Sequence, residues 1–311
     1  MAGFTEVAPG VAFMRCAVVN VAVLGDRSRW VLVDAALAGY GRAIRTAAEA
    51  RFGPGARPAA IVLTHGHFDH VGALNEDELL GDWNVPIYAH TLEMPYLTGQ
   101  SPYPPPDPLV GRGAMALLSR AYPRGPIDLG ARVHQLPADG RVPDAPEWRW
   151  IHTPGHTPGH VSLFRDADGT LYAGDALTTT KQESMAAVLT QRRELHGPPA
   201  YYTQDWDRAR DSFRALARLS PQLVVSGHGQ PWGGPAVRDE LTAVSNEFDR
   251  RERPAFGRYA KQPAIADESG VLMLPPDPLP ALLAGAGAMA VAGALVWMVS
   301  KREHGHTGGR S

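Results

Sequence analysis

Two short histidine-rich segments, each placed directly after an apolar run, constrain this chain more than any other feature. The first is Ile-Val-Leu-Thr-His65-Gly-His67-Phe-Asp69-His70, in which a buried strand is predicted to end just before the polar residues. Imidazole and carboxylate groups packed this densely suit zinc and similar divalent metals better than they suit a core. His65 and His67 are two positions apart, so an extended segment projects both toward one side, and Gly66 permits a tight bend between them.

Asp69 and His70 are adjacent, so they cannot face the same way on a regular element. They indicate either a second metal position or one ligand beside an orienting group. The alternative is a histidine-rich surface loop without a metal. We disfavour it because later segments supply the partners that a metal site needs.

The second segment is His152-Thr-Pro-Gly-His156-Thr-Pro-Gly-His160. Proline restricts φ and glycine permits a reversal, so the repeated turns predict a loop with little freedom. Rigid loops suit metal ligands because the ligands need a defined geometry. The spacing alone does not decide which of the three histidines is a ligand.

Two later strands also end in polar residues, one in Gly-Asp175 and one in Ser-Gly-His228-Gly. If these strands belong to one pair of sheets, their loops gather at one rim. The candidate metal ligands are then His65, His67, Asp69, His70, His156, Asp175 and His228.

This set is too large for one tetrahedral zinc, but it suits two metals. One metal is predicted to take His65, His67 and His156. The other is predicted to take Asp69, His70 and His228. Asp175 would bridge the two metals. The pKa of a water shared by two such metals is lowered toward neutrality.

These motifs resemble the metallo-β-lactamase fold superfamily, and most closely its glyoxalase-II and quorum-lactonase type hydrolases. The matching segments within residues 10–232 are Thr-His65-Gly-His67-Phe-Asp69-His70, Thr-Pro-Gly-His156-Thr-Pro-Gly-His160, Ala-Gly-Asp175 and Ser-Gly-His228-Gly. The resemblance implies an α+β fold, an αββα four-layer sandwich with a dinuclear site at the edge of its sheets. It implies two divalent ions, usually zinc and sometimes iron or manganese. Asp34 matches an aspartate that in the family supports the metal ligands from behind, His160 matches a structural position, and His152 has no family role.

The activity implied by the resemblance is hydrolysis of a small acyl substrate such as an ester, thioester or lactone, with a metal-activated hydroxide oriented by Asp69. One alternative is an iron-dependent persulfide dioxygenase-like reaction, which uses a single metal. The others are a phosphodiesterase or nuclease and a non-enzymatic membrane-tethered metal-binding protein. A net charge of −2 and a pI near 6.6 offer no electrostatic basis for binding nucleic acid, and we expect none.

Substrate choice is expected to depend on two regions whose structure the sequence pattern predicts less well. Residues 95–128 include a run of prolines that excludes a helix or a central strand, so this segment is either a pocket-shaping loop or a surface insertion. Tyr201 and Tyr202 either donate a hydrogen bond to the oxyanion, as a tyrosine does in the lactonases, or pack against the proline-rich loop, which we favour. Residues 235–280 show no match to the glutathione-binding part of glyoxalase II.

The predicted domain order is a catalytic domain at 1–256, a connector at 257–280, a transmembrane tail anchor at 281–300 and a polar tail at 301–311. Residues 281–299 carry no charge, and nineteen helical residues at about 1.5 Å each span a bilayer core. An Ala-rich helix packed on the domain is the alternative. The first residues lack a secretory signal, so we expect a cytoplasmic catalytic domain attached to the membrane by a single-pass helix. We also consider a homodimer.

Overall fold

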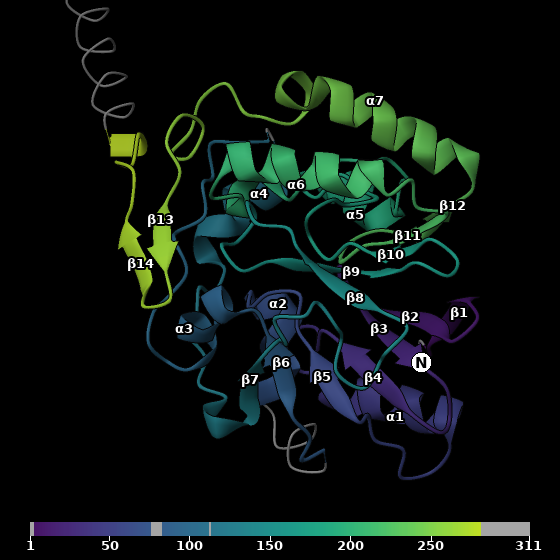
Figure 1. Ribbon diagram of the computed structural model, residues 1–311. Helices are drawn as coiled ribbons and strands as arrows, with labels where there is room; N and C mark the ends of the chain where they lie inside the picture. Colours follow the sequence, from purple (N-terminus) through teal and green to yellow (C-terminus); the bar gives the residue numbers. More distant parts are fainter. Residues whose placement is uncertain (1–2, 76–82, 112, 281–311) are drawn as a thin grey trace, which may run out of the picture. The chain divides into compact units, whose positions relative to one another are not determined.

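Two mixed β-sheets stacked face to face form the centre of residues 1–275, which make up one compact unit (Figure 1). The structure, a computed structural model, describes residues 3–75, 83–111 and 113–280. Residues 276–311 form a separate unit, of which only residues 276–280 are described.

The first sheet contains seven strands in chain order among the described residues. They are β1 (Thr5–Ala8), β2 (Val11–Cys16), β3 (Val19–Gly25), β4 (Trp30–Val33), β5 (Ala60–Val62), β6 (Ile87–Ala89) and β7 (Val133–Gln135). Neighbouring strands are antiparallel from β1 to β4 and parallel from β4 to β7. The parallel half therefore brings the carboxyl ends of β4 and β5 side by side, where Asp34 and the first histidine segment follow.

The second sheet contains five strands in the order β12-β11-β10-β9-β8 within the same described part. They are β8 (Arg149–His152), β9 (Val161–Arg165), β10 (Thr170–Tyr172), β11 (Leu223–Val225) and β12 (Trp232–Gly233). Only β10 and β11 are parallel. Their carboxyl ends therefore point the same way, and they carry Asp175 and His228 in the residues that follow.

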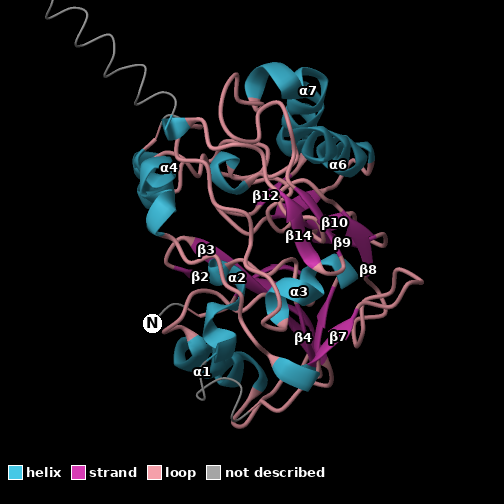
Figure 2. Ribbon diagram, turned by 90° about the vertical axis from the view of Figure 1, so that its left-hand side faces the viewer, coloured by secondary structure: helices cyan, strands magenta, loops and turns pink. Residues whose placement is uncertain are grey.

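Helices cover the outer faces of both sheets, as Figures 1 and 2 show from two directions. Helix α1 (Gly41–Phe52) packs on the first sheet, and α6 (Trp206–Arg218) and α7 (Pro235–Arg251) pack on the second. A strand covered on both faces needs apolar side chains on both. In β4, Trp30 and Leu32 face the α1 side, while Val31 and Val33 join the core between the sheets. The prediction was an α+β fold, and its coarser part, a mixed arrangement of sheets and helices, is confirmed.

Shorter elements complete the unit. They are α2 (Phe68–Val71), α3 (Met94–Leu97), α4 (Ala114–Leu118), α5 (Met185–Thr190) and the hairpin of β13 (Ile265–Asp267) and β14 (Gly270–Met273). The hairpin lies within the range predicted as a connector, and Val271 N donates to Ser101 Oγ at 3.2 Å. The domain boundaries remain a prediction.

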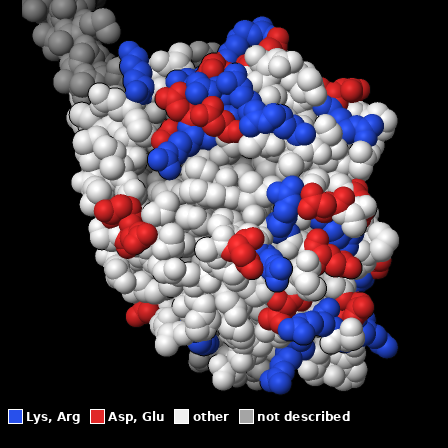
Figure 3. Space-filling model, viewed as in Figure 1, with Lys and Arg blue, Asp and Glu red and all other residues white. Residues whose placement is uncertain are grey.

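Charged side chains of both signs alternate over α6 and α7 on the face shown in Figure 3. Arg210 pairs with Asp207 at 3.0 Å, and Arg253 pairs with Asp249 at 3.2 Å. Exposed pairs of this kind contribute about 0–1 kcal/mol each. This face therefore carries locally neutralised charge and not a field of one sign.

The predicted membrane anchor is contradicted. In the part of the chain that the structure describes, no helix is both long and apolar enough to cross a bilayer. We therefore withdraw three expectations: the C-terminal apolar helix, the transmembrane segment at 281–299 and the membrane attachment inferred from it. Residues 281–311 themselves lie outside the described residues. The prediction relied on length and lack of charge, whereas a segment made mostly of Ala and Gly has little apolar side-chain area to bury.

Candidate metal centre

The first histidine segment places its polar residues in the turn between β5 and α2. His65 and His67 lie in the turn itself, and Asp69 and His70 lie in the first turn of α2. A carboxylate there is favoured by the helix dipole. In an extended segment Asp69 and His70 would point to opposite faces. In a helical turn neighbouring side chains point only about 100° apart, so both can reach the same group of ligand atoms.

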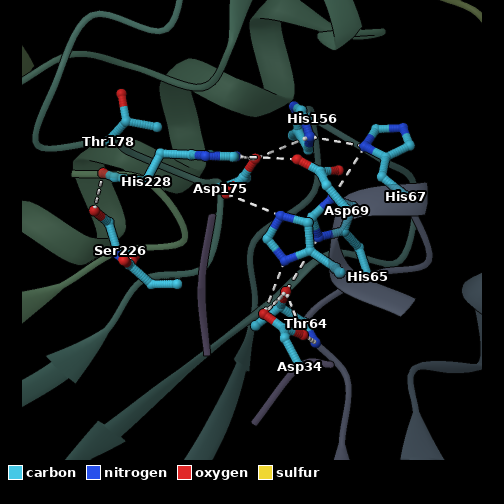
Figure 4. A network of polar contacts seen from close by, with 12 residues as sticks. Asp34, Thr64, His65, His67, Asp69, His156, Asp175, Thr178, Ser226 and His228 are labelled. Carbon is cyan, nitrogen blue, oxygen red and sulfur yellow. Dashed lines mark hydrogen bonds and ion pairs between the residues drawn. The ribbon is translucent and has the colours of Figure 1, made fainter. Parts of the chain in front are cut away.

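The other predicted ligands come from the second sheet. His156 lies in the loop between β8 and β9, Asp175 follows β10 and His228 follows β11. Figure 4 shows these side chains pointing toward those of the first histidine segment. The structure therefore brings all the predicted ligands together, and their ligand atoms form overlapping groups within 4.8 Å.

The first triad consists of His65, His67 and His156, and all three side chains are buried. His67 Nδ1 lies 3.0 Å from both His65 Nε2 and His156 Nε2. Burial lowers the pKa of His65 and His67 well below the usual value, and it lowers that of His156 to about 3. Three neutral imidazoles directed at one point offer lone pairs to a cation.

The second triad consists of Asp69, His70 and His228. His228 Nε2 lies 3.5 Å from Asp69 Oδ2. Burial lowers the pKa of His228, but the Asp175 and Asp69 carboxylates outweigh it, so the net shift is upward. One carboxylate and two imidazoles form a second set of donors suited to a divalent metal.

Asp175 lies between the two triads. Its carboxylate is 3.6 Å from His156 Nε2 in the first triad, and it is 3.5 Å from His70 Nε2 and 3.1 Å from His228 Nε2 in the second. A Cβ on Gly227 would lie 2.1 Å from Asp175 Oδ1, so the glycine of the Ser-Gly-His-Gly motif leaves room for this carboxylate. A third group of ligand atoms, from His65, His70 and Asp175, links the triads.

The donor set fits divalent metal ions. His70 Nε2 and Asp175 Oδ1 are buried and make no hydrogen bond with the described residues. Leaving such atoms without a partner is costly, and a cation between them would satisfy both. The residues can therefore hold metal, as the sequence predicts.

Asp34 orients His70 from outside the ligand set. The Asp34 carboxylate accepts hydrogen bonds from His70 Nδ1 at 2.9 Å and from Thr64 N at 2.8 Å. This contact places the His70 proton on Nδ1 and leaves Nε2 facing the metal position. Asp34 adopts φ 59°, a left-handed conformation that Asp and Asn tolerate better than most residues.

Replacing Asp34 with Asn should weaken metal binding at the second triad by about 10–100-fold, because the amide no longer fixes His70 as firmly. Asn keeps the size and the tolerance of positive φ, so the fold should persist. Competition with a chromophoric chelator measures the affinity. Equal affinity for both proteins would contradict an orienting role.

The remaining histidines of the dense segments face elsewhere. His160 Nδ1 contacts Thr153 Oγ1 at 2.8 Å, and its Nε2 accepts from the Asp175 backbone N–H at 2.8 Å, so it supports Asp175 without joining a triad. His152 contacts the Pro158 carbonyl at 2.8 Å, and its ring stacks on His90. The ring nitrogen Nδ1 of His90 accepts from Leu92 N at 3.2 Å, so this ring has a local partner.

Aromatic side chains enclose His67. The rings of Tyr103 and Tyr202 lie with their centroids 4.5 and 4.4 Å from that of His67. Tyr201 and Tyr202 pack in a small cluster that Phe68 and Tyr122 also contact. Sequence reasoning considered Tyr201 and Tyr202 but missed Tyr103 and Tyr122, whose only signal was their place within residues 95–128.

An apolar cavity of about 650 Å³ adjoins the first histidine segment. Gly66 and Phe68 contribute to its wall directly on either side of His67. The rest of the described lining comes from Leu37, Ala38, Tyr40, Val71, Gly72 and residues 123–127, and Arg124 is the one charged residue among these described residues. Residues 123–127, which belong to the predicted pocket-shaping or inserted segment 95–128, thus share a cavity wall with the turn that carries His67.

Comparison with known proteins agrees with this geometry. Residues 14–228 match the family model described as "Metallo-beta-lactamase superfamily". The chain is 48% identical over 250 residues to the "Probable metallo-hydrolase YflN" of Bacillus subtilis (strain 168), covering 79% of this chain and 94% of that protein. The chain therefore belongs to the metallo-β-lactamase superfamily. It is an enzyme of the metallohydrolase class, as predicted.

Two more distant relatives add detail. A "Hydroxyacylglutathione hydrolase" from Alkalilimnicola ehrlichii is 31% identical over 172 residues, which cover 51% of this chain and 50% of that protein. The crystal structure of a beta-lactamase domain protein from Burkholderia ambifaria superposes with a TM-score of 0.54 at 21% identity, covering 79% of this chain and 76% of that one. The latter similarity supports the fold alone.

Proposed function

We propose that this enzyme hydrolyses a small acyl substrate, an ester, thioester or lactone, with the help of two divalent metal ions. One observation supports this most directly. The Asp175 carboxylate contacts both triads, so two ions held by them would be neighbours sharing one ligand. Zn²⁺ is the expected ion because the donors are imidazoles and carboxylates, and iron and manganese remain alternatives.

The residue roles follow from position. We assign one ion to His65, His67 and His156, the other to Asp69, His70 and His228, and the bridging role to Asp175. Two bound ions would acidify a shared water and polarise the scissile carbonyl. The side chain of Asp69 is 14% exposed, against 3% for Asp175, so it is the carboxylate more open to an incoming substrate. Its Oδ atoms can accept a proton from the attacking water and hold that water in line with the carbonyl carbon.

The substrate class is inferred from the surroundings of the triads. The apolar cavity lined by Gly66 and Phe68, the neighbours of His67 in the chain, suits an acyl chain or another apolar group better than a chain of phosphates. The relative named hydroxyacylglutathione hydrolase supports a thioester or a related acyl compound. Packing remains the favoured role of Tyr201, and its hydroxyl is the alternative donor to the carbonyl oxygen, because its ring contacts Tyr202, which packs on His67.

A complete second triad favours hydrolysis over oxidation of a persulfide at a single iron. The oxidation needs one ion held by two histidines and an aspartate, whereas Asp69, His70 and His228 supply a further set of donors. Metal analysis separates the two reactions. One iron per chain together with oxygen uptake would support the oxidation.

The decisive experiment is a substrate screen with purified, metal-quantified protein. We expect hydrolysis of at least one ester, thioester or lactone, with activity rising as the second equivalent of Zn²⁺ binds. The same panel should include a phosphodiester, which we expect to remain intact. Protein that binds two equivalents of metal and hydrolyses no acyl substrate would contradict the proposed function.

A further inference from the structure

Glu93 is a completely buried carboxylate that the proposed reaction does not use. It ends the short 3-10 helix Thr91–Glu93, which follows β6, and its exposed fraction is 0%. Isolated carboxylates are almost never buried because the charge loses its hydration, so each such group needs compensating donors. Burial raises the pKa of Glu93, and the hydrogen bonds it accepts oppose that rise.

The donors to Glu93 come from both histidine segments. Gly66 N donates to Glu93 Oε2 at 3.0 Å, and Gly66 lies between His65 and His67. Thr157 Oγ1 and Gly159 N donate to Oε1 at 2.7 and 2.8 Å. One carboxylate therefore joins the turn after β5 to the loop that carries the third histidine of the first triad.

Tyr103 adds a fourth contact. Its hydroxyl donates to Glu93 Oε2 in a short hydrogen bond and accepts from Gly66 N at 2.8 Å. The same ring packs on His67. The proline-rich segment is thus attached to the metal-binding turn through the hydroxyl that contacts Glu93.

The glycines of the two motifs are independent evidence for this arrangement. A Cβ on Gly66 would lie 2.7 Å from the Tyr103 hydroxyl, and a Cβ on Gly159 would lie 2.8 Å from Glu93 Cγ. Neither glycine has a positive φ. The tight bend expected at Gly66 is therefore not the reason for a glycine there. Both positions need glycine because the Glu93–Tyr103 pair approaches closely.

We propose that Glu93 is a positioning residue that holds the two histidine segments at the separation required by His65, His67 and His156, and so sets the metal affinity of the first triad. The proposal rests on the proposed metal site. Among the described residues Glu93 makes no hydrogen bond to a ligand side chain, and it acts through the backbone of Gly66 and Gly159, through Thr157 and through Tyr103. Because its two oxygens each accept two hydrogen bonds, an amide cannot replace it. If the NH₂ group of a Gln replaces Oε1, it faces the Gly159 N–H, which then lacks an acceptor. If it replaces Oε2, it faces two donors, the Tyr103 hydroxyl and the Gly66 N–H, and Gly66 keeps only the Tyr103 hydroxyl as an acceptor.

The test compares the Glu93→Gln variant with Glu268→Gln, the same chemical change at an exposed residue in the β13–β14 turn. Apo protein is titrated with Zn²⁺ against a chromophoric chelator and with Co²⁺ followed by visible absorption. We expect Glu93→Gln to bind one of two ions about 10–100-fold more weakly and to change the Co²⁺ spectrum of that site. Glu268→Gln should match the parent protein in both titrations.

Melting temperatures separate positioning from simple packing. If Glu93 positions ligands, the rise in Tm caused by Zn²⁺ should shrink in Glu93→Gln. If apo and Zn²⁺-loaded forms lose equal stability while affinity and spectrum are unchanged, the proposal is overturned. Should Glu93→Gln fail to fold, Thr157→Val, which removes one donor, must show a smaller loss of affinity in the same direction, and unchanged affinity would overturn the proposal. A parent protein that binds no Zn²⁺ would instead refute the metal site itself.

Discussion

Replacing His67 with Ala should abolish hydrolysis and remove metal from the first triad. His67 Nδ1 lies 3.0 Å from the ring nitrogens of both other members, so its loss leaves two imidazoles and the shared Asp175 carboxylate at that position. Loss of a metal that stabilises several kcal/mol of transition-state charge corresponds to a fall in kcat/KM of about 10³-fold or more. Metal content by elemental analysis and kcat/KM on the best screened substrate are measured on the same sample.

The control for this variant is His134→Ala, which removes an exposed imidazole from β7 and should change neither quantity. His67→Ala is expected to keep its fold, because the second triad and the core between the sheets are untouched. A His67→Ala protein with full metal content and full activity would show that the first triad is misassigned.

Replacing Asp69 with Ala should also abolish turnover, and it should reduce bound metal at the second triad. Asp69 has two proposed roles, as a ligand beside His228 and as the acceptor of a proton from the attacking water. Asp69→Asn separates them, because the amide keeps an oxygen donor but accepts a proton poorly. We expect Asn to retain more metal than Ala while kcat falls by about 10²–10⁴-fold, the usual contribution of general acid–base catalysis.

Asp211→Asn, an equivalent change at an exposed residue of α6, provides the control. Metal content, kcat and KM are determined for all three variants. If Asp69→Asn lost activity only in proportion to its lost metal, Asp69 would be a ligand without a proton-accepting role.

The candidate ligands were predictable because each has a signal in the neighbouring sequence. His65 and His67 follow an apolar strand, and Asp175 and His228 follow two others, so a short window of sequence contains both the strand and its polar end. The Asp175 carboxylate lies within 3.6 Å of ligand atoms of both triads, and its bridging of two ions stays a prediction. Which of His152, His156 and His160 joins the ligands was not readable from spacing, since the three are equally spaced and only the loop's path turns His156 inward.

Other residues of the site could not be predicted from the sequence because the residues that they contact are distant in the chain. Glu93 lies 27 residues from Gly66 and 66 residues from Gly159, and nothing near Glu93 in the sequence marks it as buried. Tyr103 and the lining at residues 123–127 occur in a segment without helical or strand periodicity, so their position depends on tertiary contacts. The membrane prediction failed for a related reason, since it relied on the composition of one segment alone.

The sequence by itself determined the class of the fold and the chemistry of the ligands, because strand patterns and the residue types that follow them are local properties. The two groups of ligands were also predicted from the sequence, but only the tertiary structure decided the distances within and between them. Two sheets must stack before the ends of β5, β10 and β11 meet, and a buried carboxylate must find donors in both histidine segments before their separation is set. The identity of the histidine ligands can therefore be predicted from the motifs. The distances between them depend on residues elsewhere in the fold, such as Glu93, which accepts hydrogen bonds from both histidine segments, and Gly227, which leaves room for Asp175.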